Sequence, residues 1–494
     1  MRFDRSDGVF CHVTSLPGAY GIGDLGEGAR DFLSFLGDAD VDHWQICPIG
    51  PTLSVAGESP YQSPSAFAGN PLFVDPEGLV DDGWLDEGDL RPVPDFPTDR
   101  VDYDAVREYK LPLLRTAFEQ FEERATEEDR AALGAFRERE PWLADYALFR
   151  ALSDARPEDV WTEWPAPLRT RDPDALAEAR EEHAAEVRFR AFVQWTFDRQ
   201  WHDLRAVAAD EGVSIVGDVP IYVALDSADV WASPEAFRLD EGNRPTAVAG
   251  VPPNAGDSGQ RWGNPLYDWD WIERTEFDWW RRRVSRLFEL VDEARLDHFK
   301  GFHEFWAIPE DADSPAEGKW VEGPGAALFD ALERDHGDLP FVAEDLGFLD
   351  AGAVGLRERL GLPGMRVPHY ADWCEEGHMY QPMHYPRDSV GYTATHDTDT
   401  TVGYYESMDP AHRDCLHYNL GVDGSEIAWS MIDAVWGSNA VLALTTPQEL
   451  LGLGSEARLN TPGTAEGNWN WRFRDGALDD VTERLARITD RHVR

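Results

Sequence analysis

The chain has 494 residues, 42% of them hydrophobic, which is enough for one large barrel with insertions or for two to three smaller domains. Asp and Glu total 94 against 45 Lys and Arg, a formal net charge of −49, so the chain should repel nucleic acid. No run approaches about 20 consecutive apolar residues, and the first residues lack a basic stretch followed by an apolar one, so we expect neither a membrane span nor a secretory signal.

The acidic residues are spread along the whole chain. Lysine occurs only at Lys110, Lys300 and Lys319, and arginine supplies the other positive charges. This composition predicts adaptation to high salt, because counter-ions there screen the repulsion between exposed carboxylates. An acidic tail that binds a partner is the alternative, and the even spread of the acids disfavours it.

The four cysteines, Cys11, Cys47, Cys374 and Cys415, are widely separated in the sequence. They form no CxxC motif and no Cys/His ligand spacing, so the sequence predicts neither a zinc site nor disulfide bonds. A cytoplasmic, reducing location fits this pattern best, and we expect no metal ion and no other cofactor.

Short apolar runs that end in polar residues recur along the chain and are typical of buried parallel strands. In chain order the predicted strands are Val9–Ser15, His43–Ile49, Ser214–Val223, Ala294–Phe299, Phe341–Leu346, Gly364–Val367, Ser389–His396 and Ala440–Thr446. Helical patterns lie between most of them, as in Ala29–Leu36, Trp279–Glu293 and Ala326–Arg334. This alternation predicts an α/β fold of the (β/α)8 TIM-barrel class, with residues 1–494 forming a single catalytic domain.

The segment between the second and third predicted strands is too long for one βα unit. It begins with a loop over Pro51–Asp75 and a Pro- and Asp-rich stretch over Asp81–Asp104. A helical region then follows at about Tyr103–Gln200, with apolar positions at helical spacing in Leu111–Phe121. We therefore predict a mainly helical insertion at about 76–200. Little chain follows the eighth strand, so we expect no separate C-terminal β-domain.

Three acidic residues, Asp297, Glu344 and Asp397, stand near or just after the ends of predicted strands. Barrel active sites form at the carboxyl ends of strands, so these side chains can converge. Cleaving a glycosidic bond with retention needs a proton donor and a nucleophile, and a third carboxylate can stabilise an oxocarbenium-like transition state. In a chain with 94 acids, however, a single carboxylate is usually a solvated surface group. Spacing alone leaves both interpretations open.

Two further features bear on this choice. Arg295 lies two residues before Asp297, on the same face of the predicted strand, and can pair with it. An unpaired charge beside apolar strand residues would be costly. The chain also holds 20 tryptophans, which are common in protein cores and also suit stacking on sugars.

Ordered motifs along nearly the whole chain resemble the amylomaltase (4-α-glucanotransferase) family, glycoside hydrolase family 77. The matching segments are Thr14–Gly18, Gly21–Gly26, Trp44–Gln45, Pro48–Pro51, Ser59–Ser63, Ser65–Pro71, Gly217–Val223, Gly259–Pro265, Gly452–Arg458 and Gly467–Trp469. The resemblance implies a retaining, metal-independent enzyme that moves α-1,4-glucan segments between maltodextrins. Maltose, maltotriose, longer maltodextrins, and starch or glycogen chains are the expected substrates, and the expected assembly is a monomer or weak homo-oligomer.

The resemblance also implies roles for single residues. Asp297 looks like the nucleophile, Glu344 like the general acid/base and Asp397 like the transition-state stabiliser. Arg295 would orient and ionise Asp297.

Four more residues would bind or shape the sugar site. His396 would bond sugar hydroxyls, and Tyr61 would stack on the same glucose. Asp218 would shape the site, and Trp262 would line the sugar groove. Each residue also has a purely structural interpretation. His396 can be a core histidine whose hydrogen bonds are satisfied, and Tyr61 a packed loop tyrosine. Asp218 can make a structural hydrogen bond, and Trp262 can simply pack.

The sequence departs from the family pattern at two places. Lys300 stands where the family usually has Arg, and an ammonium cannot reproduce a guanidinium fork. The loop at 252–260 lacks the family's aromatic pair and is one residue shorter, which bears on water exclusion and acceptor length. A hydrolase of the α-amylase type and a catalytically silent starch- or glycogen-binding protein are the rival hypotheses, the latter disfavoured by the three carboxylates.

Overall fold

The computed structural model describes residues 4–157, 159–254, 258–347, 350–464 and 466–494. Within these ranges, eight parallel strands close a barrel in the order β1-β12-β11-β10-β9-β6-β3-β2. The barrel strands are β1 (Ser6–Phe10), β2 (His43–Gln45), β3 (Ser214–Val219), β6 (Glu293–Leu296), β9 (Phe341–Ala343), β10 (Gly364–Arg366), β11 (Ser389–Tyr392) and β12 (Leu442–Thr445). Each one overlaps a predicted strand, so the predicted barrel is confirmed.

The barrel strands are buried along almost their whole length, as their apolar runs predicted. The observed strands are nevertheless shorter than the predicted ones. The first begins and ends earlier than Val9–Ser15, because Val13–Ser15 form a 3-10 turn. Likewise β6 ends at Leu296 and β11 at Tyr392, so the candidate site residues that follow lie in loops at the barrel mouth.

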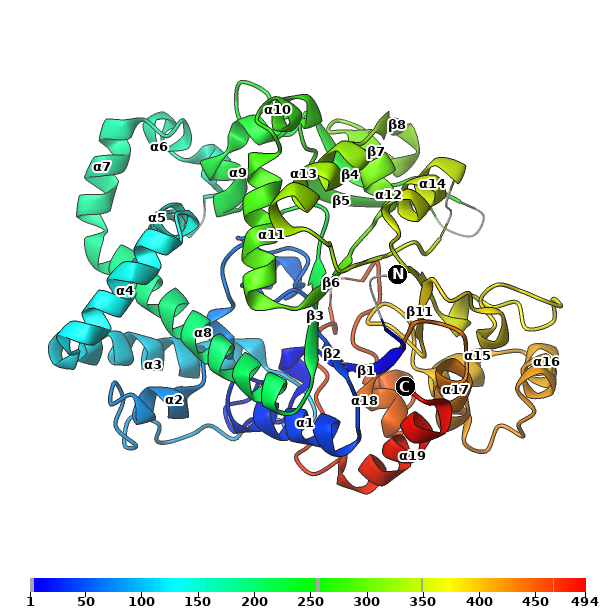
Figure 1. Cartoon of the computed structure of the whole chain (residues 1–494). Helices are drawn as coiled ribbons and strands as arrows, with labels where there is room; N and C mark the ends of the chain where they lie inside the picture. The colour runs from blue at the N-terminus through cyan, green and yellow to red at the C-terminus, as the bar shows by residue number, and fades with distance from the viewer. Residues whose placement is uncertain (1–3, 158, 255–257, 348–349, 465) are drawn as a thin grey trace.

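Helices precede most barrel strands and cover the barrel (Figure 1). They are α1 (Glu27–Asp38), α11 (Asp278–Leu290), α13 (Ala326–His336), α14 (Ala351–Leu360), α17 (Ile427–Trp436) and, after the last strand, α19 (Thr482–His492). The three helices predicted by name coincide with α1, α11 and α13. Between β10 and β11 the chain makes two 3-10 turns and no α-helix, so the regular alternation is interrupted there.

The chain between β2 and β3 is helical and forms a lobe on one side of the barrel (Figure 1). Its helices are α2 (Pro76–Asp81), α3 (Tyr103–Arg124), α4 (Glu127–Arg139), α5 (Trp142–Ala155), α6 (Ala166–Arg169), α7 (Pro173–Glu182) and α8 (Ala184–Asp210). Phe121 of α3 and Phe192 of α8 pack on each other in a tilted arrangement, and both meet the ring of Trp84 edge-on, which holds the two helices together. Because α8 also packs on α1 and leads into β3, it joins the lobe to the barrel.

A second sheet, which the sequence did not predict, lies beside the barrel mouth. It is antiparallel, in the order β5-β4-β7-β8. Its strands are β4 (Ala247–Val251), β5 (Gln260–Pro265), β7 (Glu304–Pro309) and β8 (Lys319–Glu322). The remaining short helices are α9 (Ala228–Ala232), α10 (Trp269–Arg274), α12 (Lys300–His303), α15 (Thr401–Ser407), α16 (Pro410–Leu420) and α18 (Pro447–Leu450). In the described chain beyond β12 there are helices and loops but no further strand.

The prediction of no disulfide bonds is wrong. Cys374, in the segment between β10 and β11, is bonded to Cys415 on α16, with 5.2 Å between their Cα atoms. The two residues are 41 positions apart, and loops from neighbouring barrel strands bring them together. Cys11 and Cys47 are buried free thiols. None of the helices in the described ranges has the length and apolar character needed to cross a bilayer.

Candidate active site

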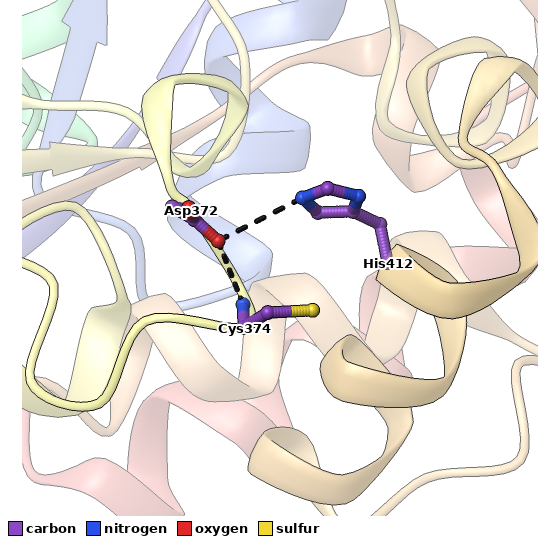
Figure 2. Close-up of side chains that lie close together, drawn as sticks. All are labelled: Asp372, Cys374 and His412. Atoms are coloured by element: carbon purple, nitrogen blue, oxygen red, sulfur yellow. Dashed lines mark hydrogen bonds and ion pairs between the residues drawn. The ribbon is translucent and has the colours of Figure 1, made fainter.

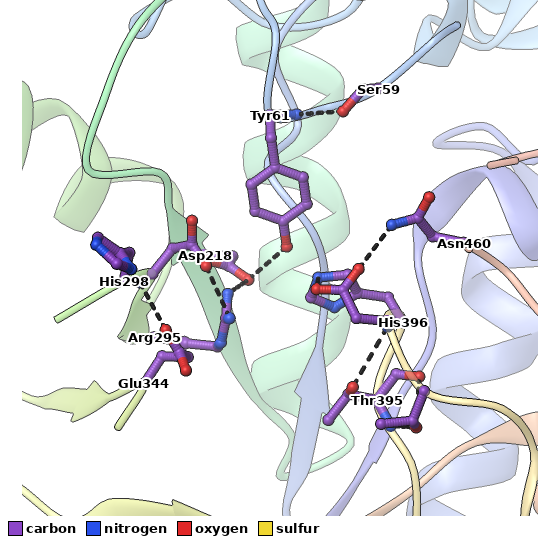
Figure 3. A network of polar contacts seen from close by, with 12 residues as sticks. Ser59, Tyr61, Asp218, Arg295, His298, Glu344, Thr395, His396 and Asn460 are labelled. Atoms are coloured by element: carbon purple, nitrogen blue, oxygen red, sulfur yellow. Dashed lines mark hydrogen bonds and ion pairs between the residues drawn. The ribbon is translucent and has the colours of Figure 1, made fainter. Parts of the chain in front are cut away.

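The candidate site lies at the carboxyl ends of β3, β6, β9 and β11, where their loops meet (Figure 3). Strand register places Asp218 of β3 directly beside Arg295 of β6. The ladder continues past the strand ends, because the backbone N–H of Asp297 donates to Val219 and that of Glu344 donates to Leu296. The barrel itself therefore brings these side chains together, as expected for parallel strands that end at one rim.

The guanidinium of Arg295 joins two carboxylates. Its Nη1 donates to Oδ2 of Asp218 at 2.6 Å, and its Nη2 donates to Oδ1 of Asp297 at 2.8 Å. The expected pair of Arg295 and Asp297 is thus present. Burial by itself lowers the pKa of Arg295, but these two carboxylates outweigh burial and raise it. Arg295 is therefore a fixed positive charge in a buried position.

Asp218 lies deeper than the other carboxylates, with a side chain that is 0% exposed. Its Oδ2 also accepts a hydrogen bond from the hydroxyl of Tyr61 at 2.9 Å. Burial raises the pKa of Asp218 to about 6, against the opposing charge of Arg295. The buried carboxylate of Asp218 is therefore bonded to both Arg295 and Tyr61.

Asp297 is more accessible, with 28% of its side chain exposed. Oδ1 is occupied by Arg295, whereas Oδ2 accepts no hydrogen bond from the described part of the chain. One oxygen of Asp297 is therefore fixed, and the other is available to a ligand.

Glu344 is held by backbone N–H groups of two loops. The backbone N–H of His298 donates to its Oε2 at 2.9 Å (Figure 3). The backbone N–H of Leu346 donates to its Oε1, also at 2.9 Å. His298 has a left-handed backbone conformation with φ of 49°, a conformation uncommon outside glycine. Burial raises the pKa of Glu344 to about 7 and the Asp297 carboxylate adds to this rise, while Arg295 opposes it. The side chain can therefore carry a proton near neutral pH.

Asp397 is held differently, by the side chains of His396 and Asn460, which Figure 3 shows across the site from Arg295 and Glu344. Its Oδ1 accepts from the amide of Asn460 at 2.6 Å, and its Oδ2 lies 3.3 Å from Nε2 of His396. Arg458 donates to its backbone carbonyl at 2.6 Å. Burial opposes ionisation of Asp397, but His396 and Asn460 outweigh burial and hold its pKa well below the usual range.

Aromatic rings line both sides of the site. The ring of Tyr61 is stacked on His396, with 5.2 Å between centroids, and Trp469 lies against both. On the opposite side, Trp262 of β5 packs edge-on against His298 at 4.9 Å. All eight predicted site residues are therefore connected to this one region.

Four contributors were not predicted from the sequence: Asn460, Arg458, Trp469 and the backbone of His298. Arg458 and Trp469 fall inside recognised motifs, which was a usable signal, whereas Asn460 had none. Lys300 is engaged elsewhere, because its ammonium lies 2.8 Å from Asp350 and 3.1 Å from Glu304. The short loop noted in the sequence includes residues 255–257, which lie outside the described residues.

The carboxylates of Asp297, Glu344 and Asp397 do not belong to any cluster in the described ranges that could hold a metal ion. In the described ranges, two clusters have the side chains and spacing to hold a metal ion, and both lie away from these carboxylates. One consists of His303, Glu304 and Asp350, and the other of Asp372, Cys374 and His412.

Comparisons with known proteins point one way. Residues 11–479 match the family model described as 4-alpha-glucanotransferase. The 4-alpha-glucanotransferase of Thermus thermophilus is 47% identical, covering 98% of this chain and 100% of the relative. That of Synechocystis sp. is 41% identical over 100% and 99% of the two chains. The solved amylomaltase from Streptococcus agalactiae in complex with acarbose superimposes with a TM-score of 0.96, at 34% identity and 99% coverage of both chains.

Proposed function

This chain belongs to the 4-α-glucanotransferase family, glycoside hydrolase family 77, and we propose that it disproportionates maltodextrins with Asp297, Glu344 and Asp397. Family membership makes it a 4-α-glucanotransferase that acts on α-glucans. The proposal adds a retaining double displacement and assigns each carboxylate a step. It rests above all on one observation: Arg295 joins Asp297 to the buried Asp218, next to an acid whose pKa is raised to about 7.

Asp297 is the proposed nucleophile. Its Oδ1 is bound by Arg295, which orients the carboxylate, and Oδ2 accepts no hydrogen bond within the described chain. Attack of Oδ2 on C1 of the donor glucose forms a glycosyl ester while the bond from C1 to the glycosidic oxygen breaks.

Glu344 is the proposed general acid and base. In the first step its proton passes to the departing glycosidic oxygen. In the second step the carboxylate takes the proton of an acceptor 4-hydroxyl, whose oxygen attacks C1 and displaces Asp297. A pKa near 7 suits both duties, because the group then changes protonation state at low cost.

Asp397 is the proposed stabiliser of the oxocarbenium-like transition state. Its lowered pKa keeps it ionised, and a fixed negative charge stabilises the positive charge that develops on the sugar. We further propose that His396 and Asn460, which bond Asp397, hold it toward the sugar ring, and that His396 also bonds ring hydroxyls.

The remaining residues receive supporting roles. Asp218 is buried and bonded to Arg295, which supports a positioning role under the site. Tyr61, stacked on His396, and Trp262, packed against His298, are only partly buried, and they are the proposed sugar contacts. Maltose, maltotriose and longer maltodextrins are the proposed substrates.

The test is chromatography of the products formed from pure maltotriose. The expected wild-type products are glucose, maltopentaose and a ladder of longer chains. Asp297→Asn should abolish the ladder, and the matched surface variant Asp38→Asn should leave it unchanged. Glucose and maltose alone would mean hydrolysis instead of transfer, and activity that survives in Asp297→Asn would refute the nucleophile assignment.

We also propose that the chain works in concentrated salt. Support comes from the net charge of −49, which favours a folded state whose surface repulsion is screened. Thermal unfolding followed by circular dichroism should show a midpoint that rises steadily up to molar KCl. Full stability and activity in salt-free buffer would contradict this proposal.

A further inference from the structure

The geometry points to a redox-gated binding site for a soft divalent cation, with Zn²⁺ as the best fit, where the segment 371–381 meets α16. We propose that reduction of the Cys374–Cys415 disulfide releases two thiolate ligands. His412 and Asp372 supply the other two, which completes a four-coordinate site. This site is separate from the catalytic carboxylates and goes beyond the proposed transferase activity.

The ligand atoms already converge. One ligand atom from each of Asp372, Cys374 and His412 lies within 4.8 Å of the other two. Figure 2 shows the imidazole of His412 facing the carboxylate of Asp372, with the sulfur of Cys374 beside them. Nε2 of His412 is 3.7 Å from Oδ1 of Asp372. Cys415, one helical turn after His412, is bonded to Cys374 and therefore brings its sulfur to the same point.

His412 is oriented as metal-binding histidines usually are. Its Nδ1 is bonded to Oδ2 of Asp409 at 2.8 Å, which leaves Nε2 directed at Asp372. A carboxylate on the far nitrogen fixes the ring tautomer and raises the basicity of the ligating nitrogen. Asp372 is likewise fixed, because its Oδ1 accepts the backbone N–H of Cys374 at 2.9 Å.

The two cysteine segments are held together by contacts other than the disulfide. The amide of Asn419 donates to the backbone carbonyl of Trp373 at 2.7 Å and to that of Cys415 at 2.9 Å. Trp373 and Leu416, each next to one of the cysteines, are buried at 1% and 0% exposure. After reduction the sulfurs therefore stay close, and side-chain rotation alone can open the roughly 3.8 Å sulfur separation that follows from Zn–S bonds of about 2.3 Å in a tetrahedron.

Opening the Cys374–Cys415 disulfide requires a reductant. A dithiol reductant transfers two electrons and two protons to the disulfide and is oxidised to its own disulfide. A phosphine supplies the two electrons and becomes a phosphine oxide with oxygen from water, and the same water supplies the two protons. Either route leaves two thiols. Binding of Zn²⁺ then displaces the two thiol protons. Two sulfurs, one imidazole and one carboxylate match the ligand preference of Zn²⁺ and disfavour Mg²⁺ or Ca²⁺.

The chain offers an internal contrast. The cluster of His303, Glu304 and Asp350 has similar spacing but no sulfur ligand, and the ammonium of Lys300 lies 2.8 Å from Asp350 and 3.1 Å from Glu304. A bound cation there would have to displace an ammonium. Within the described ranges, neither Asp372 nor Cys374 is paired with a Lys or Arg side chain. Both residues are exposed, which gives an ion a path of entry.

The experiment titrates Co²⁺, a coloured substitute for Zn²⁺, into the full chain after reduction with a phosphine that does not chelate metals. We expect one equivalent bound, with sulfur-to-cobalt charge-transfer bands and the intense visible bands of a tetrahedral site, both lost on adding Zn²⁺. The oxidised chain should show neither band. A reduced chain that binds Co²⁺ without charge-transfer bands would overturn the proposal.

Single-residue variants distinguish a specific metal site from adventitious binding. Asp409→Asn should weaken Zn²⁺ binding by about 10–100-fold, as loss of a supporting carboxylate does. His412→Gln, which removes a ligand, should weaken it further and change the visible bands. His417→Gln, on the same helix and bonded to Tyr405, is the matched control and should bind as the wild type does. Equal affinity in all three variants would refute the site.

Discussion

The two sides of the barrel mouth hold their carboxylates by different means. On the β3–β6–β9 side, strand register and one buried guanidinium fix Asp297, and backbone N–H groups fix Glu344. On the β11 side, Asp397 lies in a loop with 42% of its side chain exposed, held by the side chains of His396 and Asn460.

The difference has a chemical consequence. Burial raises the pKa of Glu344 to about 7, while hydrogen bonds and the histidine hold that of Asp397 well below its usual range. Environments that push two carboxyl groups apart in pKa suit one to carry a proton and the other a fixed charge. The same residue chemistry thus serves two roles, according to whether burial or hydrogen bonding dominates.

The largest expected effect comes from removing the acid on the strand side. Glu344→Gln should lower kcat/KM for maltotriose by about 10²–10⁴-fold, because the leaving oxygen loses its proton donor. With maltotriosyl fluoride, whose leaving group needs no proton, the first step should be far less affected. The control is the exposed Glu358→Gln, and an equal loss with both donors would contradict the acid role.

The next effect tests the shared cation. Arg295→Lys should lower kcat by about 100-fold, because an ammonium cannot bond Asp218 and Asp297 together in the fork geometry of a guanidinium. Steady-state kinetics on maltotriose measure the loss. The control is Arg281→Lys, which changes an ion pair on α11. Near-wild-type activity in Arg295→Lys would show that the guanidinium is not what positions Asp297.

A smaller effect is expected on the loop side. Asn460→Ala removes one hydrogen bond to Asp397 and should lower kcat about tenfold, since the exposed carboxylate regains a partner from water. The same change raises the pKa of Asp397, because Asn460 helps to lower it. When the pH is lowered, the variant should therefore lose activity at a higher pH than the wild type does. A loss larger than that of Arg295→Lys would reverse the ranking of the two sides.

The smallest effect near neutral pH, about twofold, is the pH dependence of the unmodified enzyme. The pKa of Glu344 is raised, so the acid form is present below about pH 7 and disappears above it. The value of kcat/KM should therefore fall to about half near pH 7 and by about tenfold for each further pH unit. A profile that stays flat to pH 9 would remove Glu344 as the acid.

Much of the site was predictable because its residues follow strands. Asp297, Glu344 and Asp397 stand where apolar runs end, and parallel strands bring such positions to one rim. Arg295 and Asp297 share a face two residues apart, and the predicted pair is present. The antiparallel sheet beside the mouth was not predicted, because β4 is a short run of small residues that includes a glycine, and β5 contains both Gly and Pro.

By itself the sequence determined the barrel, the helical segment between its second and third strands, and the family, since these depend on local periodicity and ordered motifs. Tertiary structure alone decided which side chains meet across long separations. Asn460 reaches Asp397 from 63 residues away, Tyr61 reaches Asp218 from 157, and Cys374 meets Cys415 across 41. Such contacts depend on how loops close over the rim, and neither periodicity nor spacing carries that information.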